Sequence, residues 1–223
     1  MNNLNKLMAS AIIIKRASAQ GSVILPAEEI QKLNARVPPP QQPKLKAQSK
    51  PKAPSKQIVQ SYYNPVLGAI RKAESRVADY DTMVGSNKRH NLTGMTLKQV
   101  MDYQKSHKPG SAAGAYQIIA PTMKGLVSKM KLNPEKDVYN KDLQDRMALH
   151  LLQQRGFDSY LSGKLPISSA RTNLAKEWAG LPNVGGKSYY AGTGNNAARI
   201  SEKEFLNALE QSRKLYLQNQ VNK

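Results

Sequence analysis

After residue 60, apolar residues recur at spacings of three and four through most of the chain. This spacing predicts amphipathic helices, because residues so placed lie on one helix face. The first helix is predicted to begin at Asn64, whose side chain can cap the free N–H groups, followed by Pro65, which fits the first helical turn. We expect this helix to end near Arg76 or Val77.

Glu74 lies on the same stripe of this helix as Leu67 and Ile70, so its carboxyl is expected to face the core or a cleft. It falls in the last turn, where burial and the negative end of the helix dipole both raise the pKa of a carboxyl group. A carboxylic acid that stays protonated near neutral pH can act as a general acid. The alternative is an exposed glutamate at a helix end, paired with Arg71 or Arg76.

The rest of the folded region is predicted to hold one short strand and several further helices. Val77 to Gly85 has the tyrosine, threonine, valine and final glycine of a strand and turn. The helix signals that follow are a capping box at Thr96–Gln99, Pro121, Asn140, Ser168 or Ser169, and a second capping box at Ser201–Glu204. The predicted fold class is therefore α+β, mostly helical, with a small β-sheet, and no segment is long enough to span a bilayer.

The first sixty residues have a different composition. From about Ala35 to Ser61 the chain is rich in proline, lysine and glutamine and offers few apolar side chains to bury, which is typical of a linker. Residues 1–60 contain ten Lys and Arg against two Glu, so they contribute +8 of the formal net charge of +19. We predict two parts: a basic N-terminal arm and linker over residues 1–60, and a folded domain over residues 61–223.

The beginning of the arm resembles a short secretory signal, because an apolar run is followed by small residues within Met1–Gln20. Lys15 and Arg16 interrupt that pattern. A short anchoring or partner-binding segment fits residues 1–20 equally well.

Charge and composition narrow the choice of partners. A net charge of +19 predicts a polyanionic partner, which is nucleic acid, an anionic membrane or an anionic wall polymer. Cysteine is absent, which excludes disulfides and cysteine chemistry. His90, His107 and His150 form no close pair, so we predict no metal site and no cofactor and give these residues no role.

Several short motifs occur in an order that resembles the lambda-type phage endolysin family and, more distantly, phage lysozymes. The motifs are Ala73-Glu74-Ser75, Tyr80-Asp81 with Met83-Val84-Gly85, Ser111-Ala112-Ala113-Gly114-Ala115-Tyr116-Gln117, Gln144-Asp145, Arg155-Gly156, and Trp178-Ala179-Gly180-Leu181-Pro182. The resemblance covers roughly residues 66 to 215 and implies a lysozyme-like domain. Ala115 stands where the family usually has arginine.

The family consists of lytic transglycosylases that cleave peptidoglycan between N-acetylmuramic acid and N-acetylglucosamine. The resemblance implies that Glu74 protonates the leaving oxygen and then, as a base, takes the proton of the sugar's own 6-hydroxyl, which yields a 1,6-anhydro end. A hydrolytic muramidase would use a second carboxylate. Asp79 and Asp81 are the acids close after Glu74, and strand alternation would place both on one face.

The predicted substrate-binding residues are Asp81, Ser111, Gly114, Tyr116 and Gln117, with Asp79 and Trp178 as further candidates. Small residues let a sugar approach the backbone, while Tyr116 offers a ring face and Gln117 an amide. The alternative for Tyr116 is a packing role in the core. Trp178 shares a stripe with Ala170 and Leu174 and is expected in the core.

The sequence therefore predicts a phage enzyme with peptidoglycan as its substrate. Its arm favours attachment to other virion proteins through residues 1–60 and action in the host periplasm or cell wall at genome entry. The nearest alternative is a free endolysin, made in the host cytoplasm and reaching the periplasm at lysis. An alternative from another class is a non-catalytic nucleic-acid-binding or structural virion protein with a degenerate lysozyme fold.

Overall fold

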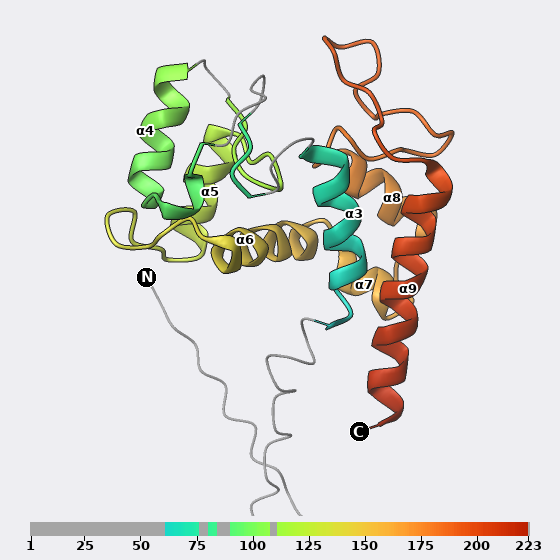
Figure 1. Cartoon of the computed structure of the whole chain (residues 1–223). Coiled ribbons are helices and arrows are strands. Elements are labelled where there is room, and N and C mark those ends of the chain that lie inside the picture. The colour runs from blue at the N-terminus through green and yellow to red at the C-terminus, as the bar shows by residue number, and fades with distance from the viewer. Residues whose placement is uncertain (1–60, 76–79, 84–89, 108–110, 223) are drawn as a thin grey trace, which may run out of the picture. The chain divides into compact units, whose positions relative to one another are not determined.

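The computed structural model describes residues 61–75, 80–83, 90–107 and 111–222. This part of the chain is mostly helical, as predicted (Figure 1). Its helices are α3 (Asn64–Glu74), η1 (Leu92–Gly94), α4 (Leu97–His107), α5 (Ala120–Lys129), α6 (Lys141–Gln154), α7 (Phe157–Leu161), α8 (Ile167–Ala175) and α9 (Glu202–Val221). None of these helices is long and apolar enough to cross a membrane.

Three predicted helix starts are confirmed by their capping bonds. At α4, the Thr96 N–H donates to Gln99 Oε1 at 2.8 Å and the Gln99 N–H donates to Thr96 Oγ1 at 3.3 Å, which is a complete capping box. At α6 the Asn140 side chain accepts from the Leu143 N–H. At α9 the Ser201 hydroxyl accepts from the Glu204 N–H.

The predicted ends of α3 and the start of α8 are wrong by one to three residues. Asn64 is the first helical residue rather than the cap, because the backbone of Tyr63 is already helical and no side chain caps this end. The helix ends at Glu74, since Ser75 is extended. α8 begins at Ile167 after an extended Pro166, so both serines lie inside it. The short helices η1 and α7 were not predicted.

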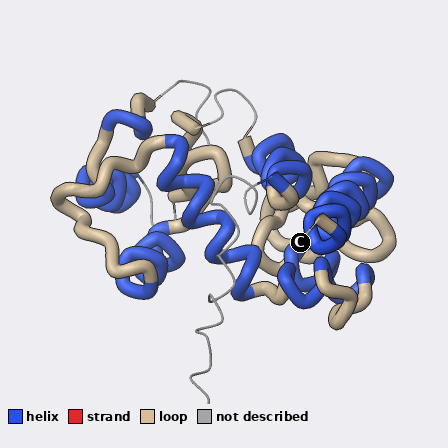
Figure 2. The backbone as a smooth tube through the Cα atoms, turned by 90° about the horizontal axis from the view of Figure 1, so that it is seen from below, coloured by secondary structure: helices blue, strands red, loops and turns tan. Residues whose placement is uncertain are grey.

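The predicted small sheet is not shown by the described residues. They hold only isolated antiparallel bridges, which pair Met83 with Ala113, Ala113 with Ile118, Thr96 with Val138, and Pro182 with Ser188. Most of the Val77 to Gly85 segment lies outside the described ranges. In the described part, Figure 2 accordingly shows helices joined by loops.

Helix α3 lies between two groups of helices, α4 and α5 on one side and α7, α8 and α9 on the other (Figure 1). It packs along α9 and also contacts α6. One continuous core surrounds it, which includes Val66, Ile70, Met147, Leu151, Phe205 and Leu209. Burial of apolar side chains between α3, α6 and α9 therefore fixes α3, and with it the position of Glu74 at its C-terminal end.

Gln144 is a fully buried amide that joins three separate backbone segments. Its Oε1 accepts from the Ala115 N–H at 2.9 Å. Its Nε2 donates to the carbonyl of Tyr80 at 3.0 Å and to that of Tyr139 at 2.9 Å. The amide thus replaces the regular hydrogen bonds that these irregular segments lack.

We expect Gln144→Leu to lower the free energy of unfolding by roughly 2 to 4 kcal/mol, because it leaves buried backbone groups without a partner while keeping a similar side-chain volume. Urea denaturation measures the change. Gln154→Leu is the matched control, since Gln154 lies on the same helix but is exposed and should change stability little. Equal stability of the two variants would contradict the role given to Gln144.

Candidate active site

Glu74 is the last residue of α3. Its side chain accepts a hydrogen bond from the loop that contains Gly180, more than a hundred residues later in the sequence. The Gly180 N–H donates to Glu74 Oε1 at 2.8 Å. Part of Glu74 remains accessible to solvent. Because Oε1 is engaged as an acceptor, the other carboxyl oxygen is the one left to carry a proton.

Gly180 has to be glycine because of this close approach. An added Cβ would lie 2.5 Å from the Ala73 carbonyl oxygen and 2.9 Å from Glu74 Oε1. The neighbouring Trp178 and Leu181 are buried and keep the loop against the core. Burial of these two side chains therefore fixes the position of the N–H that orients the carboxyl.

The surroundings of Glu74 act on its charge in opposite directions. Loss of hydration raises the pKa of Glu74 above its usual value. The Gly180 N–H and the Arg199 cation favour the carboxylate and so partly oppose this rise. Arg199 is placed by its own N–H, which donates to the Gly180 carbonyl at 2.8 Å. Its Nη1 donates weakly to the Glu74 carbonyl at 3.4 Å. A carboxyl in this setting keeps a proton at higher pH than a solvated one and has a cation nearby once the proton leaves.

The alternative of an exposed Glu74 paired with Arg71 does not match the structure. Arg71 points away from it, donating from Nη1 to the Tyr116 hydroxyl at 2.9 Å and lying 3.7 Å from Asp145 Oδ1. Arg76, the other suggested partner, lies outside the described residues.

Asp81 is placed in a structural position. Its side chain is 5% exposed, and its Oδ1 accepts from the Thr93 N–H at 2.8 Å. Its carbonyl accepts from the His90 N–H at 3.0 Å. Asp81 thus stabilises the turn that carries it, while Asp79 lies outside the described residues.

The Ser111 to Gln117 segment forms a tight turn that packs inside the domain. Gly114 has φ of 78°, and an added Cβ would lie 2.3 Å from Gln144 Oε1. Ser111 is buried, and its carbonyl accepts from Gln104 Nε2. The Gln117 amide donates back to the Gly114 carbonyl at 2.8 Å. These contacts build the turn; sugar binding by these residues stays a prediction.

The two aromatic candidates are both buried. Tyr116 is 1% exposed, which matches the packing alternative for this residue rather than an open ring face. Burial raises the pKa of Tyr116 well above its usual value, so its hydroxyl keeps the proton that it donates to Asp145 Oδ1 at 2.6 Å. Trp178 is 3% exposed, and its expected core position is confirmed.

Gly180 and Arg199 were not selected from the sequence, and Arg71 was named only as an alternative partner of Glu74. Gly180 lay in a quoted motif, but its contact with Glu74 joins residues over a hundred positions apart. Arg199 and the bonding of Arg71 gave no sequence signal at all, because their partners are brought together only by the fold. No group of three or more His, Asp or Glu side chains in the described ranges is placed to hold a metal ion.

Comparison with models of protein families identifies the family of this chain. A family model described as Endolysin matches residues 67–206, which include Glu74, the tight turn at Gly114 and the Gly180 loop. No curated protein and no solved structure matches the chain.

We expect Glu74→Gln to raise the melting temperature at pH 7, because it removes a carboxylate that the folded state holds in a poorly hydrated place. The pKa of Glu74 is higher in the folded protein than in the unfolded chain, so the wild type loses stability as pH rises above about 4 and the amide variant does not. The gain should vanish below about pH 4, where both states of the wild type are protonated.

Thermal melts of both proteins from pH 3 to pH 8 measure this difference. Glu135→Gln, at an exposed position, is the matched control and should track the wild type. A Glu74→Gln variant that melts with the wild type at every pH would show that the carboxyl is well solvated.

Proposed function

This chain belongs to the endolysin family of phage enzymes that degrade the cell wall by cleaving peptidoglycan, and we propose that it acts as a lytic transglycosylase in which Glu74 is both acid and base. The observation that carries the proposal is the setting of Glu74. It is a poorly hydrated carboxyl at a helix end, oriented by the Gly180 N–H and still partly accessible.

In the proposed reaction, the Glu74 carboxyl first gives its proton to the glycosidic oxygen as the bond from that oxygen to C1 of N-acetylmuramic acid breaks. The resulting carboxylate then takes the proton of the 6-hydroxyl of the same sugar, and that oxygen forms the new bond to C1. The Arg199 cation supports the carboxylate between the two steps. No water is consumed, and Glu74 ends protonated, as it began.

The position of Asp81 favours this one-carboxylate reaction over hydrolysis. A hydrolytic muramidase needs a second carboxylate to activate water or to attack the sugar. Asp81 is buried and already accepts the Thr93 N–H, so it is poorly placed to serve. The proposal therefore assigns all proton transfers to Glu74.

Digestion of purified murein should yield muramic acid ends that are 1,6-anhydro, and these are lighter than hydrolysed ends by one water. Mass spectrometry of the released fragments measures this. Glu74→Gln should lose about two to four decades of rate, because an amide cannot donate the proton.

Two results would contradict this proposal in different ways. Reducing muramic acid ends from the wild type would replace the transglycosylase by a hydrolase while leaving Glu74 as its acid. A Glu74→Gln variant that keeps more than about a tenth of the wild-type rate would exclude Glu74 as the acid. Glu135→Gln serves here too as the control for loss of an acidic side chain.

We further propose that the basic arm holds the enzyme in the virion, so that the wall is opened as genome delivery begins. The support is compositional, since residues 1–60 carry +8 and few apolar side chains in their linker part. A free endolysin would need no such attachment.

Deletion of residues 1–60 should leave murein cleavage largely intact and remove the protein from purified phage particles. The reason is compositional, because Pro38 to Ser61 offers too few apolar side chains to belong to a core. Immunoblots of particles carrying the full or the shortened chain measure retention. Equal amounts of both chains in particles would show that the arm does not retain the enzyme there. Absence of the full chain from particles would favour the free endolysin.

A further inference from the structure

A polar cluster lies one helical turn before Glu74 and takes no part in the reaction proposed above. It consists of Arg71 of α3, Tyr80, Tyr116 and Asp145 of α6. Asp145 Oδ1 accepts from the Tyr80 hydroxyl at 2.9 Å and from the Tyr116 hydroxyl at 2.6 Å, and Arg71 Nη1 lies 3.7 Å from the same oxygen. The cluster therefore draws on four separate stretches of the chain.

The cluster has more hydrogen-bonding capacity than its internal bonds use. Two tyrosine hydroxyls already hold Asp145 Oδ1, so Arg71 is not needed to satisfy that oxygen. A guanidinium has five N–H donors, and among the described residues Arg71 donates one side-chain hydrogen bond, to Tyr116. The side chains of Arg71 and Asp145 are 26% and 39% exposed, so unused donors and acceptors can reach a ligand.

Tyr80 adds a ring to this arrangement. It is only partly buried, and the Arg71 guanidinium lies 5.8 Å and the Lys141 ammonium 5.5 Å from its ring centre. Both cations lie over the ring, so they fix its orientation and cover part of its faces. The rest of the ring, next to an arginine and a carboxylate, offers apolar surface for the C–H groups of a sugar and partners for its hydroxyl and acetamido groups.

The position of Arg71 relates the cluster to Glu74. The two residues are three positions apart on α3, which places them on neighbouring parts of one face, about 4.5 Å apart along the helix axis. Arg71 reaches toward Tyr116 and Asp145, whereas Glu74 reaches toward Gly180. A chain molecule with its reactive bond at Glu74 would meet the cluster next.

We propose that Arg71, Tyr80 and Asp145 bind a sugar unit of the glycan strand beside the bond that is cleaved. This inference rests on the proposed function, because it takes Glu74 as the reacting group. The Arg71 N–H groups donate to the sugar's oxygen atoms, the second oxygen of Asp145 accepts from its hydroxyl groups, and the Tyr80 ring packs on its apolar face.

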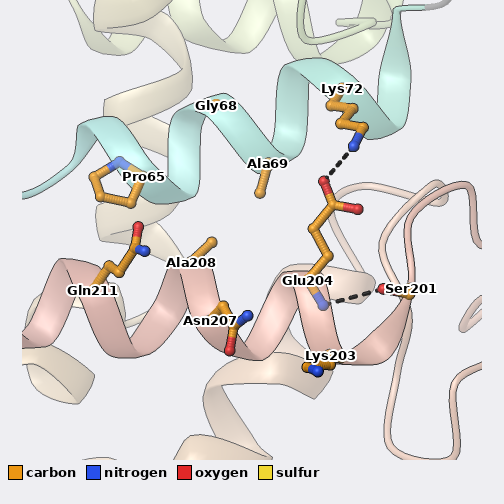
Figure 3. A pocket seen from close by; sticks show the side chains of 10 residues that line it. All are labelled: Pro65, Gly68, Ala69, Lys72, Ser201, Lys203, Glu204, Asn207, Ala208 and Gln211. Atoms are coloured by element: carbon orange, nitrogen blue, oxygen red, sulfur yellow. Dashed lines mark hydrogen bonds and ion pairs between the residues drawn. The ribbon is translucent and has the colours of Figure 1, made fainter.

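The neighbouring Lys72 provides a matched control. Its side chain leaves α3 on nearly the opposite side from Glu74, since successive residues turn by about 100°. Lys72 lines a groove of about 420 Å³ between α3 and α9 and pairs there with Glu204 at 2.6 Å. Figure 3 shows this pair. Lys72→Met removes one positive charge from the same helix without touching the cluster.

The test is titration of the full-length protein with chitohexaose, an uncharged N-acetylglucosamine hexamer, by isothermal calorimetry, together with KM and kcat on murein and thermal melts. Arg71→Met should weaken chitohexaose binding and raise KM by about tenfold, which is the effect of losing a hydrogen bond to a charged group, with kcat changed much less. Lys72→Met should match the wild type in every measurement.

Wild-type chitohexaose affinity in Arg71→Met would overturn the inference and leave the proposed function standing. The inference would also be overturned if Arg71→Met bound muropeptides with peptide stems more weakly but bound chitohexaose as the wild type does. The cluster would then bind the carboxylates of the peptide stems rather than the sugar. If Arg71→Met melts at a much lower temperature, Arg71→Lys replaces it in the binding test. Lysine keeps the positive charge but lacks the planar guanidinium that can donate two parallel hydrogen bonds. Wild-type chitohexaose affinity in Arg71→Lys would then overturn the inference. A wild type that binds chitohexaose through Arg71 but cleaves no murein would support the sugar site and remove the proposed function.

Discussion

The contact between the Gly180 backbone and the end of α3 is the constraint on which the candidate active site depends. The N–H lies 2.8 Å from Glu74 Oε1, and no side chain larger than hydrogen fits between them. The contact joins the first described helix to a loop more than a hundred residues later. It persists because Trp178 and Leu181 are buried on that loop and α3 is packed on several sides, so apolar burial supplies the free energy that holds a polar group in place.

The same contact explains how one residue meets opposite demands. Burial favours the neutral acid, which the first step of the proposed reaction needs, whereas the Gly180 N–H and Arg199 favour the carboxylate, which the proposed second step needs. Such a carboxyl costs stability at neutral pH, and natural enzymes commonly carry this kind of cost at their reactive groups. The fold offsets it elsewhere with hydrogen-bonded buried polar groups, among which Gln144 is the clearest.

The motif residues from Tyr80 to Gln117 act mainly through packing and internal hydrogen bonds. Gln144 holds their backbone, Asp81 closes one turn, and Tyr116 fills the core while its hydroxyl reaches Asp145. Tyr116 and Asp145 also contact the guanidinium of Arg71, one helical turn before Glu74 on α3. Arg71, Tyr80 and Asp145 keep partly exposed groups next to one another, which is why the sugar contact is assigned to them.

The sequence by itself determined the helical character and several helix starts, and it predicted that Glu74 faces inward from the last turn of the first helix, because helical periodicity and capping depend on residues a few positions apart. It also determined the family, through motifs kept in order. The sequence predicted the boundaries of α3 and α8 less accurately. The start of α3 depends on the helical backbone of Tyr63 and that of α8 on the extended backbone of Pro166, and the pattern of apolar residues does not indicate either conformation. Only the tertiary structure decided that Gly180 and Arg199 meet Glu74, that Tyr116 is buried, and that Arg71 turns toward Asp145, because each of these contacts joins residues far apart in the chain that packing alone brings together.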